Sequence, residues 1–450
     1  MTTSIARTLG SNGSRRKGTL SFWYKKCEIG TSRMVYSSFT SGGNNHNLLF
    51  NTDDTLRWAS QVSSSAKINL ITKRLFRDTN AWYHIVLAFD TEQGTSSNRA
   101  KMYINGVQET SFSTEVYPSQ NDDLEVNKSG EHIYFNKNGD GAGMEADCVY
   151  SHIHYIDGTM YDASTFGSTD STTGEWKINT SPSVTYGTNG FFILKNGNSV
   201  TDQSGNSNNF TVEQGTLTKT EDNPSNVFCT INPLYRMDLS NNATLSNGNT
   251  YYSSDQSGYN IRYGTLGANK GKFYFEGKFI SHNPQTSPGM PIGISGSQIP
   301  SGAQNCGYAQ YDYSYNYDGS NGTVQTNNGS TNYGTTILDT VGQIGMCAFD
   351  LDNNKIYFGV NGVWTNSANP SSGTGGYTIA DPDDTELGFY FPQIGDRSSG
   401  RAYVYAWNFG NGYFGSTQIS SAGNNASGIG LFEYDVPTGF TALSTKGLNL

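Results

Sequence analysis

Two pairs of carboxylates, each interrupted by a single residue, have a spacing that suits catalysis on sugar linkages. Glu145 stands two positions before Asp147, and Glu433 stands two positions before Asp435. Alternate residues of a β-strand point to the same face, and a retaining glycosidase needs carboxyl groups only about 5–5.5 Å apart. On a strand, either pair could therefore supply an acid and a nucleophile.

His152 and His154 are also separated by one residue, so both would point to one face of a strand and could bind a transition metal. No Cys or carboxylate at a familiar ligand spacing completes such a site. We therefore favour packed or exposed histidines on a sheet over a metal site.

Asp350, Asp352, Asn353 and Asn354 offer oxygen atoms suited to calcium, which is a hard cation. The same residue types form ordinary hairpin turns, because Asn and Asp tolerate positive φ. We favour the turn, and the sequence predicts no bound metal and no cofactor.

Tyr311, Tyr313, Tyr315 and Tyr317 alternate with polar residues, so on a strand all four would lie on one face. Tyrosine combines apolar area with a hydroxyl group and has only two χ angles, which suits contact surfaces. The row could stack on sugar rings or on another protein chain, and it could equally cover the core of a sandwich. Trp364, just after an Asn-Gly turn, could join this surface or pack on its own hairpin. These five residues are the candidate ligand-binding site.

No other reactive constellation stands out in the sequence. There is no Ser-His-Asp or Cys-His arrangement and no Gly-rich loop between a strand and a helix that could hold phosphate.

The net charge of -10 and the pI near 5.1 disfavour nucleic acid as a partner. The five cysteines are scattered and never in Cys-x-x-Cys spacing, which indicates free thiols. No apolar run approaches the ~20 residues of a membrane helix, and no export signal is recognisable, so no membrane insertion is expected.

The elements that would position these residues are strands. With 53 Gly, 29 Tyr, 23 Phe and 15% charged residues, the composition is that of a turn-rich β protein. Helical periodicity is hard to find, whereas short alternating runs bounded by Gly, Asn, Asp or Ser recur throughout. The fold class is therefore all-β, with many short strands that indicate antiparallel sandwiches or jelly rolls. The predicted strands are residues 19–25, 34–39, 48–50, 56–59, 81–90, 101–104 and 149–156, then 271–280, 290–294, 306–317, 343–350, 355–360, 387–394 and 402–409.

One short sequence pattern occurs twice in the chain and indicates two domains of similar architecture. Ala-Phe-Asp at residues 88–90 leads to an Asn-Gly-Val hairpin at residues 105–107, and Ala-Phe-Asp at residues 348–350 leads to another at residues 361–363. Asn-Gly between apolar runs predicts a type I′ turn, which needs φ > 0 at both central residues. A polar stretch with two Asn-Pro pairs separates the halves. The predicted domains are residues 1–222 and 223–450, which suits all-β units of about 200 residues.

The first half resembles the laminin-G-like, concanavalin A-type domain that phages of marine bacteria often carry in virion proteins. The resemblance rests on Ser-Phe-Trp-Tyr, Phe-Arg-Asp, Ala-Trp-Tyr-His-Ile-Val and Tyr-Ile-Asn-Gly-Val, at residues 21–24, 76–78, 81–86 and 103–107. It continues through residues 154–158, 166–167, 174–176, 186–191 and 202–206. This similarity covers most of residues 19–232 and implies a two-sheet sandwich.

The second half resembles a SPRY domain. The similarity lies in Gly-Lys-Phe-Tyr-Phe-Glu, Asp-Leu-Asp and Val-Asn-Gly-Val-Trp, at residues 271–276, 350–352 and 360–364. The joint at residues 222–228 and 232–234 and the ending at residues 436–443 resemble the same phage proteins. SPRY domains are also two-sheet sandwiches, so the resemblance predicts two concanavalin A-like sandwiches in tandem.

These resemblances imply a phage virion protein, a tail fibre or appendage that is made in the host cytoplasm and binds a host-surface glycan or receptor. Its other partners would be virion proteins and further copies of itself, with a trimer common among such appendages. A capsid-attached or tail-scaffold subunit is the first alternative. A polysaccharide hydrolase is the second, because the same fold houses enzymes with a Glu-x-Asp-x-Glu or Glu-x-Asp-x-x-Glu strand motif. Both carboxylate pairs lack the last glutamate, so we expect no enzyme.

Overall fold

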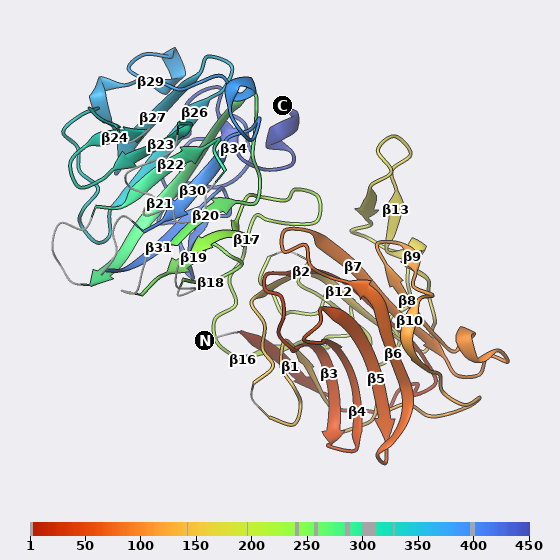
Figure 1. Cartoon of the computed structure of the whole chain (residues 1–450). Coiled ribbons are helices and arrows are strands. Elements are labelled where there is room, and N and C mark those ends of the chain that lie inside the picture. Colours follow the sequence, from red (N-terminus) through yellow and green to blue (C-terminus); the bar gives the residue numbers. More distant parts are fainter. Residues whose placement is uncertain are drawn as a thin grey trace. The chain divides into compact units, whose positions relative to one another are not determined.

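The computed structural model describes residues 3–141, 143–195, 197–238, 243–255, 260–283, 289–298, 312–326, 329–396 and 401–450. Its regular elements are strands that form mostly antiparallel sheets, together with a few short 3₁₀ turns. The chain divides into two compact units, Met1–Lys219 (unit 1) and Thr220–Leu450 (unit 2) (Figure 1). The sequence placed the division after residue 222. The prediction of an all-β chain built from antiparallel sheets is confirmed.

Unit 1 contains two large sheets. The eight-stranded sheet has the order β10 (Phe112–Val116), β6 (Ser65–Leu75), β5 (Thr55–Val62), β4 (Asn44–Phe50), β3 (Arg33–Ser41), β11 (His132–Phe135), β1 (Ser4–Thr8) and β16 (Thr211–Gln214). The six-stranded sheet has the order β15 (Phe191–Ile193), β12 (Cys148–Asp157), β2 (Lys17–Lys26), β7 (Trp82–Asp90), β8 (Ala100–Ile104) and β9 (Val107–Gln108). A separate hairpin joins β13 (Gly167–Thr169) and β14 (Trp176–Ile178).

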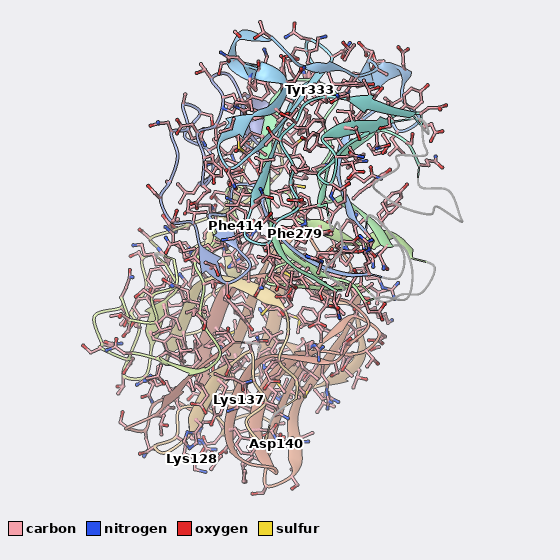
Figure 2. The ribbon with its side chains drawn as sticks, turned by 90° about the vertical axis from the view of Figure 1, so that its left-hand side faces the viewer. Lys128, Lys137, Asp140, Phe279, Tyr333 and Phe414 are labelled. Carbon is pink, nitrogen blue, oxygen red and sulfur yellow. The ribbon has the colours of Figure 1, made fainter. Side chains whose placement is uncertain are left out.

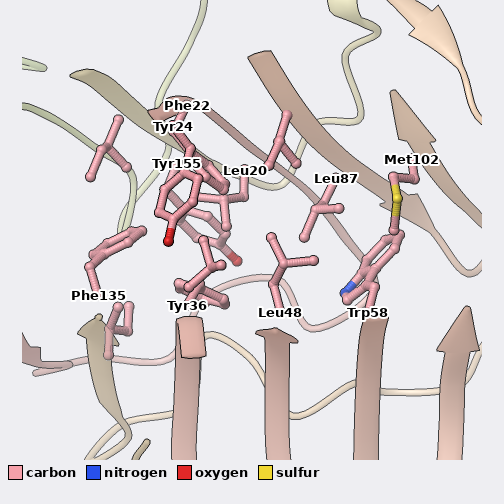
Figure 3. Close-up of a cluster of buried hydrophobic side chains, with 14 of the residues drawn as sticks. Leu20, Phe22, Tyr24, Tyr36, Leu48, Trp58, Leu87, Met102, Phe135 and Tyr155 are labelled. Carbon is pink, nitrogen blue, oxygen red and sulfur yellow. The ribbon is translucent and has the colours of Figure 1, made fainter. Parts of the chain in front are cut away.

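The core of unit 1 lies between these two sheets. Figure 3 shows the side chains of Tyr36, Leu48 and Trp58, from the eight-stranded sheet, packed toward those of Leu20, Leu87 and Met102, from the six-stranded sheet. All six side chains are buried. Because successive residues of a strand point to opposite faces, this inward set also determines which residues of each strand face outward.

Unit 2 has the same two-sheet plan. The seven-stranded sheet has the order β17 (Ile231–Asp238), β20 (Asn260–Gly264), β30 (Phe391–Gly395), β22 (Pro291–Ser295), β23 (Ser314–Asp318), β24 (Thr323–Thr326) and β25 (Gly329–Asn332). The second sheet has the order β18 (Thr244–Ser246), β19 (Tyr251–Ser253), β31 (Ala402–Asn408), β21 (Lys272–Asn283), β26 (Ile344–Asp350), β27 (Lys355–Val360) and β28 (Val363–Trp364), with β29 (Tyr377–Thr378) beside β27 and β34 (Thr441–Ala442) beside β21. A small hairpin joins β32 (Tyr413–Phe414) and β33 (Thr417–Gln418).

Short 3₁₀ turns complete the two units. They are Ser96–Asn98, Ala163–Thr165, Thr365–Ser367, Pro370–Ser372, Pro382–Asp384 and Gly447–Asn449. Within the described ranges, no helix is both long and apolar enough to cross a membrane.

The two Asn-Gly hairpins predicted from the sequence are confirmed. Asn105 and Gly106 have φ of 48° and 81°, and Asn361 and Gly362 have φ of 50° and 82°. Each asparagine also ties its turn to a neighbouring strand. The backbone N–H of His84 donates to Asn105 Oδ1 at 2.7 Å, and that of Ile344 donates to Asn361 Oδ1 at 2.8 Å.

We predict that Gly106→Ala destabilises the protein by about 1–3 kcal/mol, because an L-residue is strained at this φ. In addition, a Cβ there would lie 2.4 Å from the Trp176 ring. The control is Gly42→Ala, where a Cβ would meet nothing within 4 Å. Urea unfolding followed by tryptophan fluorescence measures both effects. Equal effects of the two changes would contradict this role of the turn.

Candidate functional site

The tyrosine row of the sequence analysis belongs to the core of unit 2 where the structure describes it. Tyr315 and Tyr317, on β23, are 7% and 0% exposed, and Tyr313 packs against the same core half-buried. The Tyr317 ring stacks on that of Phe358 at 5.3 Å between centroids. Tyr311 lies outside the described residues. Tyr315 and Tyr317 thus follow the core-packing alternative, because the inward face of β23 leaves their rings no free side for a sugar.

Trp364 also packs on its own unit rather than standing free. It is half-buried against a cluster that includes Tyr274 and Phe432, and its ring meets that of Tyr274 edge-on at 6.2 Å. Tyr274 and Phe432 both lie outside the hairpin of Trp364.

Neither carboxylate pair has the strand geometry that catalysis would need. Glu145 and Asp147 lie in the loop before β12, where Glu145 Oε2 accepts a bond from the backbone N–H of Gly143 at 3.0 Å. Glu433 and Asp435 also lie outside the strands. Because the residues of each pair are not alternate positions of a strand, the same-face argument does not apply to them.

The second pair organises loops instead. Asp435 Oδ1 accepts from the backbone N–H of Asn424 at 2.6 Å, and Glu433 Oε2 accepts from that of Ser420 at 2.7 Å. The backbone N–H of Glu433 in turn donates to the buried carboxylate of Glu276 at 3.0 Å. These contacts hold the segment that follows β33 against the sheet.

The two histidines of β12 do not share one regular strand face, because a bulge interrupts the pairing between Ser151 and His154. His152 has a positive φ of 49° at this bulge. His154 is buried with its ring 3.8 Å from that of Phe192, and its Nδ1 lies 2.9 Å from the Tyr186 hydroxyl. Among the described residues, no three His, Cys, Asp or Glu side chains are grouped as a metal site would require.

Asp350 is the centre of a hairpin turn. Its Oδ1 accepts from the backbone N–H groups of Asp352 and Asn353 at 3.1 and 3.0 Å, and its Oδ2 pairs with Lys272 Nζ at 2.9 Å. Asn354 has a positive φ of 54°. The carboxylate oxygens are thus used within the turn, as the turn interpretation expects.

The described cysteines are not joined by disulfide bonds, as the prediction of unpaired thiols expects. They are Cys27, Cys148, Cys229 and Cys347. Burial raises the pKa of the Cys148 and Cys347 thiols, which disfavours the reactive thiolate. Cys306 lies outside the described residues.

A polar face that the sequence analysis did not identify lies on the outer side of the eight-stranded sheet. In β4 and β5, the residues Leu48 and Trp58 point into the core, so their sequence neighbours point outward. Leu49 and Ala59 are among these outward residues. The polar ones, with their counterpart on β6, are four amides and one arginine: Asn45, Asn47, Gln61, Asn69 and Arg57. We call these five residues the amide row.

Strand register brings the amide row together with aromatic and small residues. Tyr134 of β11 pairs with Ser37 of β3, which pairs with Asn47 of β4. Asn47 pairs with Ala59 of β5, which pairs with Asn69 of β6. With neighbouring strands about 4.7–4.9 Å apart, these five strands span roughly 20 Å of outer face, the scale of a short oligosaccharide.

Hydrogen bonds orient the side chains of the amide row. Ser37 Oγ donates to Asn47 Oδ1 at 2.8 Å, and Asn47 Nδ2 donates to Asn45 Oδ1 at 3.3 Å. Asn45 Nδ2 donates to Gln61 Oε1 at 3.3 Å. Asn47, Gln61 and Asn69 nevertheless remain partly exposed, so polar atoms of the row are accessible to a ligand from the solvent side.

Aromatic residues continue this face beyond the amides. The half-buried ring of Tyr134 lies 6.1 Å from that of the exposed His132, and Lys137 Nζ lies 5.2 Å above the Tyr134 ring. Lys137 is labelled in Figure 2. Amide groups both donate and accept hydrogen bonds, and an aromatic ring offers a flat apolar surface. Together they match the hydroxyl groups and the apolar faces of a sugar.

Comparisons with known proteins agree with the fold of unit 1. Residues 4–139 match the family model described as the concanavalin A-like lectin/glucanases superfamily. Unit 1 therefore contains a concanavalin A-like domain. No curated protein sequence matches the chain.

Similar solved structures include the SPRY domain of human HERC1, at 17% identity over 39% of this chain and 96% of that one, with a TM-score of 0.29. A heptameric SAP-like pentraxin from Limulus polyphemus is 14% identical over 48% of this chain and 91% of that one, with a TM-score of 0.29. The TRIM65 PSpry domain is 10% identical over 40% of this chain and 91% of that one, with a TM-score of 0.26.

We predict that acid destabilises unit 1 through His84. The indole N–H of Trp176 can only donate, and it donates to His84 Nδ1 at 3.0 Å, while Nε2 lies 2.9 Å from Ser21 Oγ. Burial lowers the pKa of His84 from 6.5 to about 3. The unfolded chain therefore binds the proton first, and the stability present above pH 6.5 is lost as the pH falls toward 3.

Calorimetry between pH 7 and 4 tests this effect. His84→Gln, which keeps an acceptor for Trp176, should lose less stability on acidification than the natural protein does. The control is His132→Gln on the exposed surface, which should leave the pH dependence unchanged. An unaltered pH slope in the His84 variant would contradict the prediction.

Proposed function

We propose that this chain is a non-enzymatic phage virion protein, a tail fibre or appendage that binds glycans on the host cell surface. The resemblance of both halves to phage virion proteins supports the virion setting. The amide row with Tyr134 is the single observation that carries the binding role. In this proposal the chain is made in the host cytoplasm and acts on the virion.

Glycan binding suits the chemistry of this face better than protein binding does. The core of a protein-binding surface is usually depleted of charged residues and enriched in aromatic residues and Met. Here Asn47 and Asn69 lie at the centre of the face, beside the small buried residues Ser37 and Ala59 on neighbouring strands. Such a surface offers many hydrogen bonds, which a polyhydroxylated chain can use.

Catalysis is not part of the proposal. The pairs Glu145 with Asp147 and Glu433 with Asp435 lie in loops and bond to neighbouring backbone N–H groups. A retaining mechanism needs two carboxyl groups that face one sugar linkage, and neither pair has the strand placement that the hydrolase alternative assumed.

The proposed partners are other virion proteins, a host glycan and further copies of this chain. A homo-oligomer, such as a trimer, would repeat the amide row and raise avidity for a repeating polysaccharide. If the chain is instead a capsid-attached or tail-scaffold subunit, it would bind the other virion proteins but no glycan. Immunogold labelling of virions separates a tail position from a capsid position.

We predict that changing Asn47 and Tyr134 together to alanine weakens binding to host cells and to their extracted polysaccharide by about tenfold or more. Each lost hydrogen bond or ring contact is worth about 1 kcal/mol, and about 1.4 kcal/mol corresponds to a factor of ten. Microscale thermophoresis measures the affinity, and a thermal melt checks that the variant is folded.

The matched control is Ser168→Ala, an exposed change on the separate hairpin of unit 1, which should leave binding unchanged. Binding that survives the double change would refute the assignment to this face. A protein that labels virions but binds neither host cells nor their polysaccharide would favour the scaffold alternative.

A further inference from the structure

Arg57 is the one cation within the amide row, and it lacks an acidic partner among the residues that the structure describes. Two other cations of the same sheet are paired with carboxylates. Lys67 lies 3.0 Å from Asp122, and Arg74 lies 2.9 Å from Glu109. Arg57 thus differs from these neighbours in having its charge available.

The structure holds the Arg57 side chain in a defined orientation. Its Nε donates to Asn69 Oδ1 at 2.9 Å, while its two terminal nitrogens make no hydrogen bond or ion pair within the described ranges. A guanidinium group held by Nε still offers N–H groups in a planar fork that fits two oxygens of one carboxylate or sulfate.

The surroundings of Arg57 strengthen such a contact. Its cross-strand partners on the outer face are Leu49 of β4 and Ile71 of β6, both half-buried. Apolar neighbours lower the local dielectric constant, and a charge-assisted bond is stronger there than in open water. The side-chain amides of Asn47 and Asn69 lie beside this cation, where they can form hydrogen bonds with the hydroxyl groups of the same sugar.

The overall charge makes this local cation significant. The chain carries a net charge of -10, so its average field repels anions and would favour neutral ligands. An accessible arginine in a defined orientation on the polar face instead attracts anions locally. We propose that the amide row selects anionic polysaccharides, with Arg57 pairing with a carboxylate or sulfate group of the sugar, an inference that rests on the proposed glycan-binding function.

The experiment measures binding of the full chain to three probes by affinity electrophoresis and titration calorimetry. Polygalacturonate carries carboxylates, dextran sulfate carries sulfates, and dextran is neutral. We expect binding to at least one anionic probe, weakened about tenfold by Arg57→Gln and by a smaller factor with Arg57→Lys, because lysine keeps the charge and loses the fork. The preferred anionic probe identifies the acidic group.

Lys73→Gln is the control, because Lys73 is an exposed cation on the same sheet, and it should change the affinity less than twofold. If it weakens binding as much as Arg57→Gln does, the attraction is diffuse and the inference fails. Binding to dextran alone, unaffected by Arg57→Gln and lost on changing Asn47 and Tyr134, overturns this inference and leaves the proposed function standing. Failure to bind host polysaccharide and all three probes overturns both.

Discussion

Alternation of inward and outward residues along the strands of the eight-stranded sheet is the constraint on which the account of unit 1 depends. Burial of Leu48, Trp58 and Leu70, each worth about 1.5–3 kcal/mol, fixes the register of β4, β5 and β6. A slip by one residue would place Asn47 and Asn69 in the core and the apolar side chains in water. The core of the sandwich thereby specifies the polar face that we assign to binding.

The same constraint explains why Tyr315 and Tyr317 of unit 2 are buried. Ser314 and Asn316 share one face of β23, and Tyr315 and Tyr317 alternate with them on the opposite face. In unit 2 the tyrosines are the inward set, and their rings pack with Phe358 and Tyr390. An alternating pattern thus identifies the two faces of a strand, but it does not say which of them packs against the partner sheet.

The sequence predicted the fold class, the two Asn-Gly hairpins and most strands with an apolar inward set, including β27 at its observed bounds. It missed β6, because Lys67, Asn69 and Lys73 interrupt the pattern of apolar residues in that strand. It also missed β1 and β11, because these strands are short and pair with strands distant in sequence. The amide row could not be found from the sequence, because its members come from three strands and only the register of those strands places them side by side. Outward asparagines at alternate positions in β4, Asn45 and Asn47, were the available signal.

The most direct test of glycan binding on this face is a crystal structure of the full chain with a bound oligosaccharide from the host surface. The account predicts that the sugar lies on the outer side of β4, β5 and β6, in contact with Asn47, Asn69 and Arg57. A sugar bound to another part of the chain, with this face empty in the same crystal, would contradict the central claim.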